Sequence, residues 1–147
     1  MEIFEAIKKT EKRIKQGYFL VSAIAIASAD NKISKWTLIY QDTKTKNTMD
    51  TYVNEGGIEF GKESANEENF HELKISQIKI SSKEAISKAR KEIDKIAISV
   101  IASLISKEKP VWKISIISQD LMATSVEINA VNGKILKKSE TVIGKKM

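Results

Sequence analysis

The chain has 147 residues, enough for one ordinary domain or for two small units that share a core. It has no cysteine and a single histidine, which excludes disulfides, a cysteine nucleophile and any site built from several histidines. No apolar run approaches the ~20 residues that span a bilayer, and we expect no signal peptide within this sequence.

The formal net charge of +6 is shared unequally between the two halves. Residues 1–76 carry 11 basic and 12 acidic side chains, whereas residues 77–147 carry 14 and 7. All the basic residues except Arg13 and Arg90 are lysines, and lysine is less suited than arginine to bidentate recognition of phosphates and bases. The excess indicates either a solvated surface or a site for nucleic acid or another anionic surface.

The first half predicts one helix followed by strands. Apolar residues recur at helical spacing over residues 2–16, and Gly17 is a plausible stop. Residues 18–27 alternate as a strand with its large side chains on one face, although their alanine content also favours helix. Further strands are predicted over residues 33–42, 49–54 and 58–61.

The second half begins with a helix start signal. Ser81 and Glu84 have the spacing of a capping box, in which each side chain satisfies a free backbone amide of the first turn. Asn132-Gly133 predicts a two-residue type I′ hairpin, since both central residues of that turn need positive φ. Strands are predicted over residues 99–106, 112–118, 123–131 and 134–142.

Three features recur in the two halves at offsets of 79, 76 and 78 residues, as an internal duplication would leave them. They are Glu5-Ala6-Ile7 with Glu84-Ala85-Ile86, Trp36 with Trp112, and Val53-Asn54 with Val131-Asn132. We therefore predict an α+β fold of two tandem units, each with one α-helix packed on a three- to four-stranded antiparallel sheet. The units would be residues 1–62 and 77–147, with an acidic linker over 63–76.

The second half resembles a PepSY domain. The resemblance rests on the capped helix of residues 80–89, the aromatic-led strand of 110–114 and the closing hairpin of 126–136, and it covers about 65 residues. It extends to the first half only through Ala6, Trp36 and Val53-Asn54. It implies an interaction module with no shared catalytic residues. Related domains occur in propeptides of secreted metallopeptidases and in membrane-associated or secreted proteins, where they are thought to bind or inhibit peptidases, so the family is often extracytoplasmic.

Two groups of residues are candidates for an interaction site. Trp36 and Trp112 either cover the core or the junction between the halves, or serve as exposed binding anchors, since tryptophan is favoured in interface hot spots. A candidate basic patch could bind an anionic partner or be a solubilising tail without the aromatic side chains that stack on single strands. Its members are Lys134, Lys137, Lys138, Lys145 and Lys146.

Other polar residues predict no chemistry. His71 has no nucleophile or metal partner at a suitable spacing and is interpreted as a surface residue. Glu63, Glu67, Glu68 and Glu72 have helical spacing but lack the pattern of a calcium loop, so solvated charge is the interpretation.

The sequence thus predicts a non-enzymatic protein-binding or regulatory module that needs no cofactor or metal. Its expected partner is a protein, with a peptidase as the first candidate and a peptidase-inhibitor-like role as the specific hypothesis. The alternative is a binder of nucleic acid or another anionic surface through the basic second half.

Overall fold

Each half of the chain begins with a short amphipathic helix and continues as four strands in the computed structural model, which describes residues 1–143. A short 3-10 turn, η1, precedes the second helix. The elements in chain order are α1 (Ile3–Glu11), β1 (Tyr18–Ala27), β2 (Lys35–Asp42), β3 (Thr48–Asn54), β4 (Gly57–Ser64), η1 (Ile75–Gln77), α2 (Ser82–Glu92), β5 (Ala97–Ser106), β6 (Pro110–Ser118), β7 (Met122–Asn129) and β8 (Ile135–Val142).

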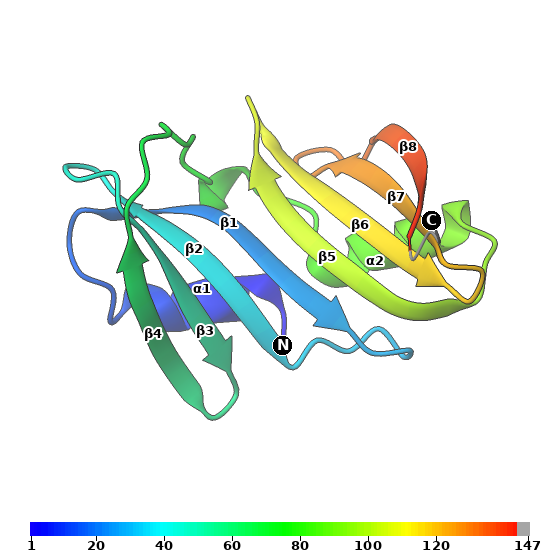
Figure 1. The fold of residues 1–147 in the computed structure, drawn as a ribbon, viewed down its shortest axis with the longest axis horizontal. Coiled ribbons are helices and arrows are strands. Elements are labelled where there is room, and N and C mark those ends of the chain that lie inside the picture. The colour runs from blue at the N-terminus through cyan, green and yellow to red at the C-terminus, as the bar shows by residue number, and fades with distance from the viewer. Residues whose placement is uncertain (144–147) are drawn as a thin grey trace.

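All eight strands belong to one antiparallel sheet with the order β4-β3-β2-β1-β5-β6-β7-β8 (Figure 1). The prediction of two tandem units, each a helix on its own sheet, is therefore wrong. The strands β1 and β5 pair antiparallel, from Ser22 with Ile105 to Ala27 with Val100. This pairing satisfies backbone groups that would otherwise form two free edges, and a free edge is open to unwanted association.

Both helices cover the same face of the sheet. Figure 1 shows α1 behind the strands of the first half and α2 behind β5 and β6. One hydrophobic cluster unites residues from both helices and both halves of the sheet, among them Ile7, Ile86 and Leu104. The opposite face carries neither helix, and we call it the open face.

The centre of the core is a contact between the two tryptophans. Their ring centroids lie 6.1 Å apart, although β1 and β5 separate the strands that carry them. Three strand spacings of ~4.8 Å lie between β2 and β6, so the indoles must lean toward each other over the middle of the sheet. The middle strands present small side chains there, including Ala25 and Ala102, which are register partners and buried. The alanines of residues 18–27 thus make room for the indoles.

The two tryptophans also tie each helix start to the sheet. The Trp36 Nε1 donates to the Met1 carbonyl at 3.0 Å, and the Trp112 Nε1 donates to the Ile80 carbonyl at 2.9 Å. Each acceptor lies two residues before the first residue of its helix. The two halves are therefore built alike at this point, while the predicted duplication of the sequence stays a prediction.

Local start and stop signals gave mixed outcomes. The capping box is confirmed: the Ser81 hydroxyl accepts from the Glu84 amide at 3.1 Å and starts α2. The type I′ hairpin is wrong, because only Gly133 has positive φ, at 77°. The Asn129 side chain accepts from the Val131 amide at 2.8 Å, so an Asx-type turn competes with the two-residue turn.

We predict that Ala102→Leu lowers the free energy of unfolding by about 1–3 kcal/mol, because added methyl groups would overfill the space under the indoles. Urea unfolding followed by tryptophan fluorescence measures the change. The control is Ala123→Leu, at a half-buried position of β7 on the open face, which should leave stability nearly unchanged. Equal losses in the two variants would contradict this account of the core.

Candidate functional site

The open face presents large apolar side chains at its centre. On β1 the alanines point to the helices, so Ile24 and Ile26 point away from them and are 41% and 67% exposed. On β5, Ile101 and Ile105 alternate with buried Ala102 and Leu104 and are half-buried. The register places Ile26 opposite Ile101. The two central strands therefore share an apolar strip that no other element of the described chain covers.

A hollow adjoins this strip at the end of β1 and the start of β2. It has a volume of about 390 Å³ and is lined by Ile24, Ile26, Lys35 and Thr37 among others. The Lys35 amine lies 5.0 Å from the centre of the Tyr52 ring, a cation–π contact that keeps this lysine beside the hollow. The hollow can accept an apolar side chain from a partner.

Lysines border the apolar strip on the second half of the sheet. Glu127 lies between Lys113 and Lys137 in the register of β6, β7 and β8. The Lys107 amine is 2.9 Å from the Glu127 carboxylate, and this lysine is the main cause that holds the pKa of Glu127 below its usual value. Three ammonium groups thus surround one carboxylate, and this border of the open face is positive.

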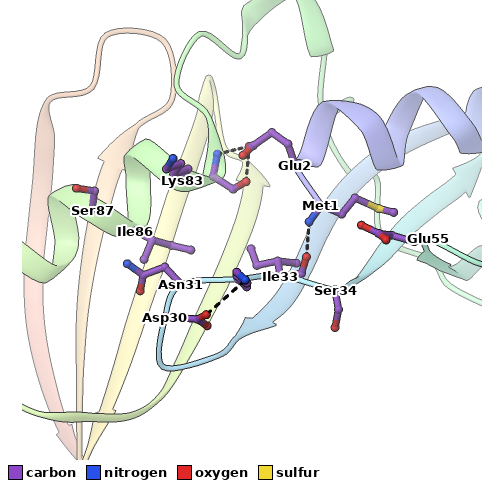
Figure 2. A pocket seen from close by; sticks show the side chains of 12 residues that line it. Met1, Glu2, Asp30, Asn31, Ile33, Ser34, Glu55, Lys83, Ile86 and Ser87 are labelled. Atoms are coloured by element: carbon purple, nitrogen blue, oxygen red, sulfur yellow. Dashed lines mark hydrogen bonds and ion pairs between the residues drawn. The ribbon is translucent and has the colours of Figure 1, made fainter.

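The largest cavity lies between the two helix starts (Figure 2). It has a volume of about 610 Å³, and its wall comprises the start of α1, residues 30–34 and the first turn of α2. The Glu2 carboxylate accepts from the Ser82 amide at 2.5 Å and also from the Ser82 hydroxyl. Because the amides at a helix start favour a negative partner, Glu2 binds α2 as an anion would.

The geometry of this pair is that of a structural connection. Ser82 is only 1% exposed, and its hydroxyl proton is directed at Glu2. A serine nucleophile instead needs an open approach to its oxygen and a base held by a third group. Glu2 precedes α1 and Ser82 begins α2, so the pair joins the two helix starts.

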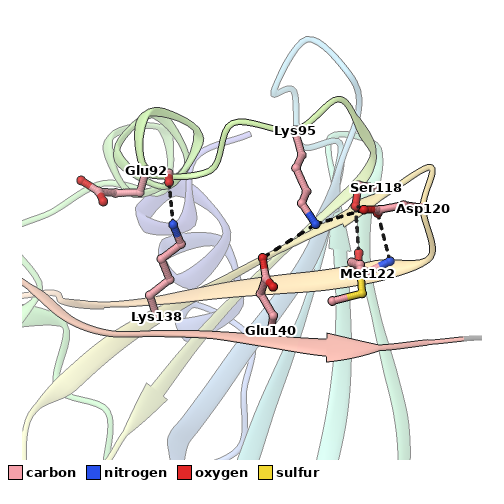
Figure 3. Close-up of polar contacts among 7 residues, drawn as sticks. All are labelled: Glu92, Lys95, Ser118, Asp120, Met122, Lys138 and Glu140. Atoms are coloured by element: carbon pink, nitrogen blue, oxygen red, sulfur yellow. Dashed lines mark hydrogen bonds and ion pairs between the residues drawn. The ribbon is translucent and has the colours of Figure 1, made fainter.

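The structure does not bring the predicted basic patch together. Lys137 and Lys138 are neighbours on β8 and point to opposite faces. Figure 3 shows the Lys138 amine donating to the Glu92 carbonyl, at 3.0 Å, where α2 ends. Lys134 lies in the turn before β8, while Lys145 and Lys146 lie outside the residues that the structure describes.

The second half contains a further charged cluster, also drawn in Figure 3. The Lys95 amine lies 3.1 Å from the Asp120 carboxylate and 3.7 Å from that of Glu140. The Ser118 hydroxyl is the main cause of the lowered pKa of Asp120, with Lys95 second. This cluster ties the loop before β5 to β8 and has a structural role.

The other candidates from the sequence are placed as follows. Trp36 and Trp112 are fully buried in the core. His71 and the glutamates at 63, 67, 68 and 72 are exposed. Within residues 1–143, no group of three or more His, Cys, Asp or Glu side chains is arranged to hold a metal ion.

Sequence reasoning missed the isoleucines of the open face. The alternation in residues 18–27 was visible, but the larger side chains were expected to mark the core. The signal that would have corrected this is size: two buried tryptophans need small residues beneath them, which assigns the alanines to the inside.

Comparisons with known proteins support the resemblance of the second half. Residues 79–138 match the model of the PepSY family, described as a peptidase propeptide and YPEB domain. The chain therefore contains a PepSY-like domain in its second half, which favours a module without catalytic function. No curated protein is significantly similar in sequence.

The whole fold has a solved counterpart. A crystal structure of a protein from Clostridium difficile 630, described provisionally as a lipoprotein, is similar to this chain with a TM-score of 0.67 and 19% sequence identity. The similarity covers 92% of this chain and 88% of the other, so both halves of the sheet are included. Neither helix in the described part of the chain is long and apolar enough to cross a membrane.

We predict that Glu2→Ala lowers the free energy of unfolding by about 1.5 kcal/mol, because the Ser82 amide and hydroxyl lose a charged acceptor. Chemical denaturation measures the loss. Glu55→Ala is the control, since Glu55 lines the same cavity and is exposed. A loss in Glu55→Ala as large as in Glu2→Ala would show that the cavity, rather than the Glu2–Ser82 contact, matters.

Proposed function

We propose that this chain is a non-catalytic binding module that receives a protein partner on the open face of its sheet. The observation that carries the proposal is the exposure of Ile24 and Ile26 on β1, beside alanines that face the core. An apolar strip of this kind on a folded protein is typical of an interaction surface. Fully burying one isoleucine side chain is worth about 1.5–3 kcal/mol, so a few suffice to hold a partner.

The charges around the strip define the chemistry of the partner. Lys35, Lys113 and Lys137 border the apolar residues, and charge complementarity then favours a partner whose apolar surface is bordered by carboxylates. The PepSY match supports a peptidase as that partner, with the module covering or regulating it.

The alternative of an anionic polymer has weaker support. Lys137 and Lys138 point to opposite faces, and Lys138 is held by the Glu92 carbonyl. A nucleic-acid groove would need basic side chains that follow one face together with exposed aromatic rings. The experiment below includes nucleic acid as an outcome that would overturn the proposal.

A photo-crosslinking residue at position 26 identifies what covers the open face in the cell of origin. The same residue at position 96 is the matched control, because Ile96 is 76% exposed but lies in the loop before β5. We expect position 26 to link to one protein that position 96 does not reach, and we expect that protein to be a peptidase inhibited or masked by the purified chain. Links only to a second copy of this chain, only to nucleic acid, or equally from both positions would overturn the proposal.

We predict that Ile26→Glu weakens binding of the partner so identified by at least about tenfold, because it places a carboxylate in the apolar strip and opposite the partner's own carboxylates. Isothermal titration calorimetry measures the affinity. Ile96→Glu adds the same charge outside the sheet and should change the affinity by less than about twofold. Equal effects of the two substitutions would place the binding surface elsewhere.

A further inference from the structure

A second hollow lies at the other end of the first half, away from the centre of the open face. Its volume is about 390 Å³, and it lies between the end of α1, the start of β1 and residues 72–76. The segment is fixed to the sheet, since the Leu73 amide donates to the Leu20 carbonyl at 2.7 Å and Leu73 is buried. The walls are therefore positioned by strand β1 and by helix α1.

Tyr40 lines this hollow with an unpartnered hydroxyl. Its side chain is 2% exposed, and its oxygen has no hydrogen-bond partner among the described residues. Burial is the main cause that raises its pKa, with the Glu11 carboxylate second, so the group is a neutral phenol. Thr10 acts in the opposite direction, but its hydroxyl donates to the Ala6 carbonyl at 2.9 Å. A buried polar atom without a partner is rare in folded proteins and points to a ligand.

Two carboxylates line the same hollow. Glu11 ends α1, and Glu72 begins the segment that crosses it. Neither forms an ion pair within residues 1–143, although Lys74 is also part of the wall. The carbonyl end of a helix carries partial negative charge, so the end of α1 adds to the negative potential. The hollow therefore favours a positively charged group.

The remaining wall is apolar. Ile14, Tyr18 and Ile75 are half-buried, and Leu20 and Leu73 are buried. An inorganic cation would gain nothing from these side chains. An alkyl chain ending in an ammonium or guanidinium group would bury its stem against them and place its charged end near the carboxylates.

We propose that this hollow binds an alkyl cation, the chemistry of a lysine or arginine side chain on a peptide. The ligand's N–H groups donate to the carboxylates of Glu11 and Glu72 and to the phenol oxygen of Tyr40, and its stem packs on Tyr18 and Ile75. The site is distinct from the apolar strip and stands independently of the partner proposed for the open face.

Nuclear magnetic resonance titration of the full chain at pH 7 tests the site. The probes are acetyl-Gly-Arg-Gly-amide, its lysine counterpart, and the citrulline peptide, which keeps the shape of arginine without the charge. Spermidine tests whether a free polyamine is the source of the cation. We expect saturable shifts of the amides near Leu20 and Leu73 with the arginine or lysine peptide, with Kd values of about 1 mM for so small a ligand.

We predict that Tyr40→Phe and Glu72→Gln each weaken this binding roughly tenfold, because each removes one acceptor of a charged donor. The controls are Tyr52→Phe, on the open face, and Glu59→Gln, on β4, which should leave the affinity unchanged. The spectra themselves report whether each variant is folded.

Four outcomes would overturn the proposal. They are equal binding of the citrulline peptide, tighter binding of spermidine than of either peptide, shifts confined to other surfaces, and unchanged affinity in folded Tyr40→Phe and Glu72→Gln.

Discussion

The pairing of β1 with β5 is the interaction on which the rest of the structure depends. It joins two four-stranded halves into one sheet, and it places the smallest side chains of the core at the centre, where Ala25 lies opposite Ala102. Only there can Trp36 and Trp112 lean inward and meet at 6.1 Å. Their Nε1 groups in turn hold the backbone before each helix, so the positions of both helices follow from the same pair of strands.

This arrangement also determines what is left exposed. Because small residues on β1 and β5 must face the indoles, the large residues of these strands lie on the other face, and both helices are already committed to the first. The open face is thus a consequence of how the core is filled. Its strip is apolar at the centre of the sheet, where the two halves meet, and becomes charged only toward β6, β7 and β8. A partner on this face would therefore contact both halves.

Much of the local structure could be predicted from the sequence, because it depends on neighbours along the chain. The alternation of residues 18–27, the cap formed by Ser81 and Glu84, and the similarity of the second half to PepSY domains were all visible there. The joining of the halves was not, since alternation shows that a strand has two faces but does not name its partner. The hollow at Tyr40 was equally invisible, because Glu11, Tyr40 and Glu72 converge only after β1, β2 and the crossing segment are in place.

The two halves contribute differently to these surfaces, and the first is more than a support for the second. The family match falls on residues 79–138, yet Ile24, Ile26 and the hollow beside Lys35 all belong to the first half. So do Tyr40 and the carboxylates around it. The second half supplies the lysines that border the open face and half of the apolar strip. Since the similar crystal structure covers both halves at only 19% identity, the fold is retained where most side chains differ. The constraint that such sequences must share is the size pattern at the centre of the sheet, whereas the residues on its open face are free to vary with the partner.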